Sequence, residues 1–247
     1  MNTYRKKAVL TGVLIILGTV FGILGAVIGG EVFISIVSNK LLAGADMLNL
    51  VASYSSQLTG GALFTIMMGT SLVAMTVFLY PIFRKDSEEL AMGMVLFRGA
   101  LMGTWYFVMV LGLFALFALG NEYIATGANS AALHSMGHVL YQIQYRFGEI
   151  GPIFFLIGTA CLLISFYRTR LIPRWLTVWG LIGVVFSMVH TNTGYDFYLK
   201  LVLVPQEMAM GIWLIVKGFN PSAIAALFAI TESAKENNNW RKNNGTN

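Results

Sequence analysis

The chain of 247 residues is 57% hydrophobic and only 11% charged, and its mean hydropathy is +0.72. So little charge cannot coat a water-soluble globule of this length, which excludes an ordinary soluble domain and indicates a protein of the lipid bilayer. The net charge of +5 resides mostly in Lys and Arg between apolar stretches, so it indicates membrane orientation and no nucleic-acid partner. The single cysteine, Cys161, excludes an intrachain disulfide.

Apolar stretches of about 20 residues, the length that crosses a bilayer, follow one another along the chain. They predict an all-α polytopic membrane protein with six transmembrane helices in one domain, residues 1–220. A short amphipathic helix and a polar, disordered tail, both cytoplasmic, are expected at 221–247. The expected crossings are residues 8–29, 59–80, 91–119, 153–167, 173–190 and 198–216.

The first expected helix carries glycines at spacings of four, three and four, which places them along one stripe. They are Gly18, Gly22, Gly25 and Gly29. Positions without side chains let another helix approach closely, so we expect packing within the chain, with a homo-oligomer seam as the alternative. An amphipathic piece at residues 41–52 is expected to lie on the membrane surface.

The stretch 129–174 holds an amphipathic outer helix directly before the fourth expected crossing. At about 100° per residue, six polar side chains share an arc about 100° wide, and the opposite arc is apolar. The polar stripe consists of His134, His138, Tyr141, Gln142, Tyr145 and Glu149. After Gly151 and Pro152 the stripe disappears, and the apolar run ends at the basic residues Arg168, Arg170 and Arg174.

Orientation follows from the distribution of Lys and Arg between the loops. One side collects Arg5, Lys6, Lys7, Arg84, Lys85, Arg168, Arg170, Arg174, Lys217, Lys235, Arg241 and Lys242. The other side collects Lys40, Arg146 and Lys200. This asymmetry predicts that both termini are cytoplasmic and that the histidines lie toward the outer face.

Two groups of polar residues are candidates for function. His134 and His138 share a helix face, and His190, Glu149 or Asp196 could complete a metal site that activates water for hydrolysis. The alternative is an interfacial helix that turns its polar side to water and headgroups. Neither His-Glu-x-x-His nor Gly-x-Ser-x-Gly occurs, and no cofactor is indicated.

The second group lies inside expected crossings: Arg98 in the third, and Gln206 and Glu207 in the sixth. Ionisable residues within the membrane are costly and often line a proton or substrate pathway. The alternative is a structural salt bridge between Arg98 and Glu207, because the two residues are expected at similar depths.

Several short stretches resemble one family. They are residues 171–176, with Trp179 and Gly180 following, residues 205–207 and residues 213–219. Tyr80-Pro81 and Phe97-Arg98 also fit. Over about residues 11–220 the chain is similar to the bacterial membrane proteins grouped as domain of unknown function 4386. The resemblance implies a six-helix protein of the bacterial inner membrane and supplies no activity. The family pattern has an acidic residue soon after the arginine, whereas this chain has residues 99–102 without one.

Three classes of function are compatible with these patterns. A non-enzymatic permease or ion-coupled carrier for a small molecule would use Arg98, Gln206 and Glu207 and would need a cavity. A regulatory or structural membrane protein would need only packing with a partner. A metal-dependent hydrolase would need the three histidines to converge. We favour transport over regulation, and either over hydrolysis.

The expected pair of Arg98 and Glu207 can be tested by a double-mutant cycle. Either R98M or E207L alone leaves one buried charge uncompensated, so each should destabilise the protein more than the double variant does. The coupling should be on the order of 3 kcal/mol. Unfolding in detergent micelles measures all four proteins. Additive effects of the two substitutions would contradict the pair.

Overall fold

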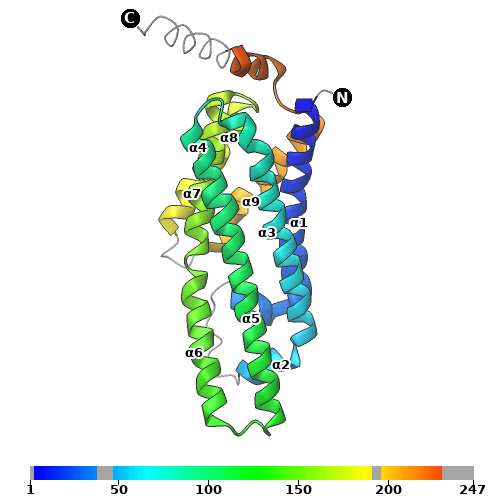
Figure 1. Ribbon diagram of the computed structural model, residues 1–247, viewed down its shortest axis with the longest axis vertical. Coiled ribbons are helices and arrows are strands. Elements are labelled where there is room, and N and C mark those ends of the chain that lie inside the picture. Colours follow the sequence, from blue (N-terminus) through cyan, green and yellow to red (C-terminus); the bar gives the residue numbers. More distant parts are fainter. Residues whose placement is uncertain (1–2, 38–46, 191–195, 230–247) are drawn as a thin grey trace, which may run out of the picture. The chain divides into compact units, whose positions relative to one another are not determined.

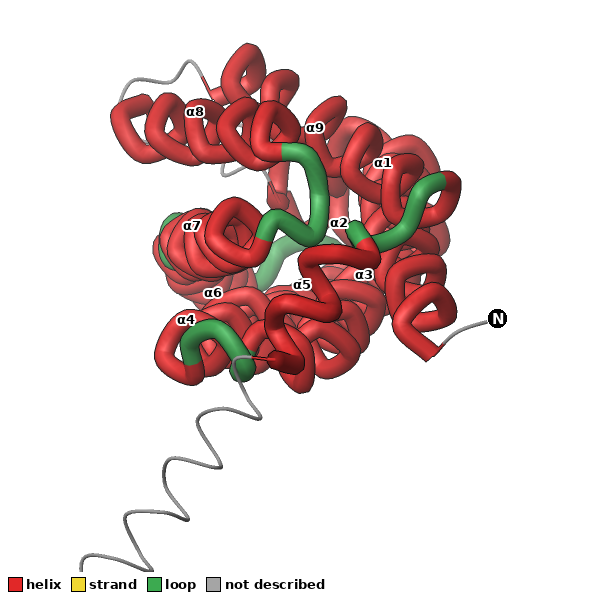
Figure 2. Tube along the Cα trace, turned by 90° about the horizontal axis from the view of Figure 1, so that it is seen from above, coloured by secondary structure: helices red, strands yellow, loops and turns green. Residues whose placement is uncertain are grey.

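The computed structural model describes residues 3–37, 47–190 and 196–229, and the regular structure within them is helical (Figures 1 and 2). The helices are α1 (Thr3–Val37), α2 (Met47–Ser53), α3 (Ser55–Phe83), α4 (Glu88–Gly93), the π-helix η1 (Met94–Leu101), α5 (Met102–Ala125), α6 (Ala131–Gly148), α7 (Gly151–Thr169), α8 (Arg174–His190) and α9 (Asp196–Val216). A further helix covers Pro221–Ala229. The expected all-α fold is confirmed.

Four helical stretches are long and apolar enough to cross a membrane: Thr3–Ile36, Ser55–Phe83, Glu88–Ala125 and Ala131–Thr169. A fifth is obtained if Val202–Val216 and Pro221–Ala229, which meet at 85°, count as one span. Arg174–Met188 is apolar but shorter. The described part of the chain is therefore a membrane-embedded helical protein with four or five candidate spans.

Local sequence signals account for several helix boundaries. The Ser87 hydroxyl accepts a hydrogen bond from the Leu90 amide at 3.2 Å and caps α4, and the Ser130 hydroxyl does the same for α6. Pro173 directly precedes α8, where a missing amide hydrogen costs nothing. In α1, Gly30 adopts φ 71°, a conformation that favours glycine, and breaks the helical geometry near its end.

The chain forms two compact units that interleave along the sequence. Unit 1 comprises Met1–Ile16, Met75–Leu96 and Ile157–Asn247, and unit 2 comprises Leu17–Ala74 and Phe97–Leu156. α1, α3, η1 and α7 each contribute to both units. Helix Pro221–Ala229 belongs to unit 1, where the Phe228 ring packs edge-on against Tyr4 and its centre lies 3.5 Å from the Lys85 ammonium. The expected boundary at residue 220 stays a prediction. The expected tail at 237–247 is outside the described residues.

Within unit 2, the glycine stripe of α1 packs on α3. A Cβ at Gly22 would lie 2.8 Å from the Met68 sulfur, and one at Gly25 would lie 3.3 Å from the Gly61 carbonyl oxygen. Along this stripe the structure therefore has the predicted packing within the chain. A homo-oligomer stays a prediction.

α2 differs from the surface helix that its sequence suggested. Leu48 and Val51 are buried, and Val51 belongs to a core cluster with Phe33, Leu116 and Tyr141. The apolar side of this short helix therefore packs against α5 within unit 2 instead of lying on a membrane surface (Figure 1). Residues 41–46 of the same expected amphipathic piece lie outside the residues that the structure describes.

The closeness of glycine contacts can be tested on α1 with two Gly→Ala substitutions. In unit 1, a Cβ at Gly12 would lie 2.6 Å from the Gly211 carbonyl oxygen, so G12A must separate two backbones. In unit 2, a Cβ at Gly18 would lie 3.7 Å from Ser71 Cβ, an ordinary contact. We expect G12A to lower the free energy of unfolding by about 1–3 kcal/mol and G18A to leave it unchanged or raise it by up to about 1 kcal/mol. Thermal unfolding in micelles measures both, and equal effects would show that the contact at Gly12 is unimportant.

Candidate functional site

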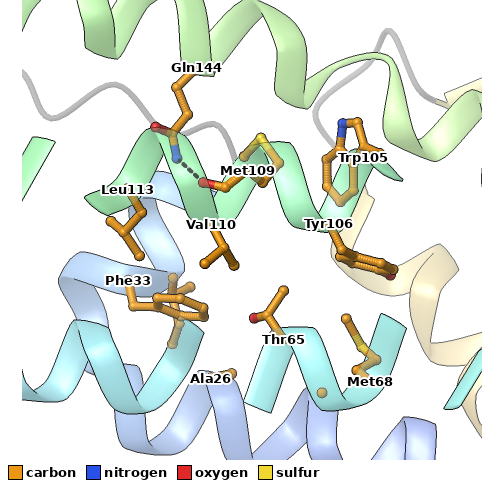
Figure 3. A pocket seen from close by; sticks show the side chains of 12 residues that line it. Ala26, Phe33, Thr65, Met68, Trp105, Tyr106, Met109, Val110, Leu113 and Gln144 are labelled. Carbon is orange, nitrogen blue, oxygen red and sulfur yellow. Dashed lines mark hydrogen bonds between the residues drawn. The ribbon is translucent and has the colours of Figure 1, made fainter. Parts of the chain in front are cut away.

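In unit 2 a buried amide joins α5 to α6. The Gln144 side chain is 5% exposed, and its Nε2 donates to the Met109 carbonyl at 3.1 Å (Figure 3). A Cβ at Gly112 would lie 2.6 Å from Gln144 Oε1, so only glycine leaves room for the amide there. Trp105 adds a second link, since its Nε1 donates to the Phe147 carbonyl at 2.9 Å. Together these bonds fix the pairing of the two helices, which run side by side in Figure 1.

Beside this pair lies a partly open cavity of about 190 Å³. Helices α1, α3, α5 and α6 contribute to its wall (Figure 3). The lining residues are Gly22, Ala26, Phe33, Ile34, Thr65, Met68, Trp105, Tyr106, Met109, Val110, Leu113 and Gln144. The wall is mostly apolar, and none of these residues carries a charge.

The polar groups in the wall are few. The Thr65 hydroxyl donates to the Gly61 carbonyl at 2.9 Å within its own helix. Gln144 Oε1 is buried and has no hydrogen-bond partner among the described residues. The aromatic rings of Trp105 and Tyr106 meet edge to face at 5.1 Å. The cavity therefore offers an apolar, partly aromatic surface, which is typical of a site for a small neutral molecule.

Arg98 is fully buried in unit 2 but does not line the cavity. It lies in η1, and its guanidinium carbon is 4.7 Å from the centre of the Phe155 ring, a cation–π contact. π-helical turns within α-helices occur frequently at functional positions. The burial of Arg98 inside an apolar helix agrees with its expected location within a crossing.

Gln206 and Glu207 lie in unit 1 and are both buried. Gln206 Nε2 donates to the Leu176 carbonyl at 3.1 Å and links α9 to α8. A Cβ at Gly180 would lie 2.9 Å from Gln206 Cδ, so this amide also packs on a glycine. This contact gives Gln206 a structural role. The pairing of Arg98 with Glu207 stays a prediction.

The outer polar stripe is divided between two environments. The predicted helix is confirmed as α6, and His134 and His138 on it, with Glu149 directly after it, are exposed. Tyr141, by contrast, is 4% exposed and belongs to the core cluster of unit 2. Gln142 and Tyr145 are half-buried. The six residues therefore do not form one water-facing surface.

The reason lies on the opposite arc of α6. Met136, Val139 and Ile143 are 57%, 57% and 61% exposed, whereas the buried positions are Gly137, Tyr141, Gln144 and Gly148. These four follow one another at spacings of four, three and four, as in the α1 stripe. A helix in lipid can expose its apolar side and pack through small and polar residues.

The histidines do not form a metal site within the described residues. No group of three or more His, Cys, Asp or Glu there could hold an ion. His134 instead lies with its ring 6.4 Å from that of Tyr123, and Glu149 pairs with Arg146 at 3.5 Å on the surface. The side chain of His190, the third expected ligand, lies outside the described residues.

Gln144 and Trp105 are the site residues that the polarity pattern missed. The polarity pattern missed Gln144 because this residue lies outside the polar stripe, although Gln142, two positions earlier, belongs to it. The signal that identifies it is the spacing of Gly137, Gln144 and Gly148, which marks a packing seam independently of polarity. The hydrogen-bonding role of Trp105 has no comparable signal in the sequence.

The helices, their apolar surfaces and the buried amides define an all-helical membrane protein. Residues 10–218 match the family described as Domain of unknown function (DUF4386). The chain therefore belongs to this family, as the motif resemblance indicated. No curated protein and no solved structure matches the chain.

The α5–α6 link can be tested with two glutamines of the same helix. Q144A removes a buried donor and the packing around it, so we expect the free energy of unfolding to fall by about 1–3 kcal/mol. Q142A changes a half-buried residue and should cost less than about 0.5 kcal/mol. Unfolding in micelles measures the difference, and a Q144A protein as stable as Q142A would contradict the link.

Proposed function

We propose that this protein is a non-enzymatic carrier that binds one small, neutral molecule in the cavity of unit 2. The main support for this proposal is the cavity of about 190 Å³ between four helices, which has no charged residue in its wall. A purely structural membrane protein would need only a solid bundle, so the cavity favours ligand binding over that alternative.

The volume limits the ligand to about the size of one aromatic ring. Apolar cavities of about 150 Å³ bind benzene, whereas typical sites for larger ligands have about 300–1,000 Å³. A charged ligand is disfavoured, because no lining residue could compensate its desolvation. A neutral single-ring compound would suit the wall, which is mostly apolar and carries no charge.

The proposal includes six crossings with both termini in the cytoplasm of a bacterial cell. α8 and α9 supply the fifth and sixth crossings. Their 17 and 21 residues correspond to about 25 and 31 Å at 1.5 Å per residue, near the thickness of the hydrocarbon core. The clustering of Lys and Arg in alternate loops supports the orientation.

Metal-dependent hydrolysis is the less favoured alternative. It requires three ligands and an open position on the metal. In the described residues only the pair His134 and His138 is available, on an exposed face of α6 and away from the cavity lining. Two ligands one helical turn apart do not make such a centre.

Binding in the cavity can be tested with benzyl alcohol and indole as probes. A ligand present at 100 times its Kd should stabilise the wild-type protein by about 2.7 kcal/mol. V110W fills the cavity and should abolish this increase in thermal stability. V108W, on the exposed side of the same helix, should retain it. M68W fills the cavity from α3 and serves if V110W does not fold.

An equal stabilisation of wild type, V110W and V108W would indicate that the probes act on the micelle, and would contradict the site. Transport is measured separately, as uptake of a radiolabelled probe into proteoliposomes. Uptake that V110W removes supports the carrier. Binding without uptake would indicate that the protein binds the probe but does not transport it.

The topology has an independent test. Reporter fusions after Lys40 and after Arg84 should report opposite sides of the membrane, because one expected crossing separates them. A fusion at the C-terminus should report the same side as the fusion after Arg84. Fusions after Lys40 and Arg84 on one side would refute the six-crossing arrangement.

A further inference from the structure

Unit 1 contains a second pocket, of about 440 Å³, between the α7–α8 loop and the chain that follows α9. The α7–α8 loop is drawn green between these helices in Figure 2. The volume falls in the range of about 300–1,000 Å³ that small-molecule sites occupy. The two stretches that carry much of the family resemblance, residues 171–176 and 213–219, both contribute to its wall.

Backbone contacts hold the two sides of this pocket together. The Asn220 amide donates to the Leu171 carbonyl at 2.9 Å and ties one loop to the other. Phe219 is buried next to Phe166, with ring centres 6.4 Å apart. Gly218 and Arg170 have positive φ angles of 76° and 53°, so both loops turn sharply directly after a helix. The pocket is therefore part of the folded structure.

The wall is strongly basic. Arg170, Arg174 and Lys217 line it, and no acidic residue does. None of the three forms an ion pair with any residue in the described part of the chain. Arg168 shows the contrast, because it pairs with Asp86 at 2.9 Å. Three cations around one pocket repel each other, and an anion bound between them would relieve that repulsion.

The helix termini around the pocket differ in sign, because α8 begins there whereas α7 and α9 end there. α8 begins at Arg174, and the start of a helix carries a partial positive charge. α9 ends beside the pocket and would oppose an anion with its last carbonyl groups. Arg5 removes that opposition by donating to the carbonyls of Leu214, Ile215 and Val216, at 3.3, 2.7 and 3.0 Å.

Aromatic residues suggest the level of the pocket relative to a membrane. Trp175 follows Arg174 and stacks on Trp179, with ring centres 6.4 Å apart, and Trp213 lines the pocket itself. Tryptophan collects where the hydrocarbon core meets the headgroups. Basic pockets at that level recognise the headgroups of anionic lipids.

We propose that this pocket binds a phosphate-bearing anion, delivered as the headgroup of an anionic lipid or as a soluble phosphate compound. Arg174 supplies a planar, bidentate partner for phosphate oxygens, and Lys217 and Arg170 supply further positive charge. The proposal is independent of the neutral ligand proposed for unit 2.

The experiment must separate a defined pocket from the general attraction of basic loops for anions. The pocket variant is R174Q/K217Q, and the control is K6Q/R84Q, which removes the same charge from unit 1 outside the pocket. All four side chains are exposed, so both proteins should fold. R174K keeps the charge at position 174 and should retain most of the binding.

The probes are dioctanoyl phosphatidylglycerol, dioctanoyl phosphatidylcholine and inorganic phosphate, with binding to full-length protein measured by native mass spectrometry and fluorescence titration. Each basic residue near an anionic group is worth a factor of about five, so R174Q/K217Q should bind phosphatidylglycerol roughly 30-fold more weakly. K6Q/R84Q should change the affinity less than about threefold.

Phosphatidylglycerol bound more tightly than both other probes, with the loss confined to the pocket variant, supports a lipid headgroup. Inorganic phosphate bound with the same variant dependence supports a soluble phosphate compound at the same site. Equal losses in the two double variants, or no preference for phosphatidylglycerol or inorganic phosphate over phosphatidylcholine, would overturn the proposal.

Discussion

The structure depends on one constraint, which is that lipid gives helices no hydrophobic reason to associate. A leucine is as well solvated by acyl chains as by another leucine, so close packing and interhelical hydrogen bonds must hold the bundle together. The glycines of α1 that face α3 meet the first need. The buried amides of Gln144 and Gln206 meet the second, each by donating to a backbone carbonyl of the neighbouring helix.

The two glutamine contacts share one design in separate parts of the chain. In each, the amide lies against a glycine of the facing helix, Gly112 or Gly180, and each leaves its carbonyl oxygen without a partner among the described residues. The arrangement requires two complementary positions on different helices. The contact with Leu176 and Gly180 also explains Gln206 better by packing than by a transport pathway.

The sequence predicted the elements better than their contacts. Run length located the apolar helices, and the glycine spacing in α1 identified a real packing stripe. Polarity failed in part on α6, because the prediction placed all residues of the polar stripe on one face toward water. Tyr141 is buried instead, and α6 packs through Gly137, Tyr141, Gln144 and Gly148 while Ile143 is exposed. The cavity and the basic pocket could not be predicted, since each combines residues more than 40 positions apart.

The two pockets differ in the ligand charge that they can accept, and the difference follows from their linings. An ion in the uncharged cavity of unit 2 would lose its hydration without compensation, which restricts that cavity to neutral molecules. The pocket of unit 1 favours an anion instead, because an anion bound there would reduce the electrostatic repulsion between its three cationic side chains. Arg5 supports this by donating to the last carbonyls of α9, whose end would otherwise repel an anion. A single ligand cannot satisfy both environments, so two chemically distinct ligands are expected for one chain.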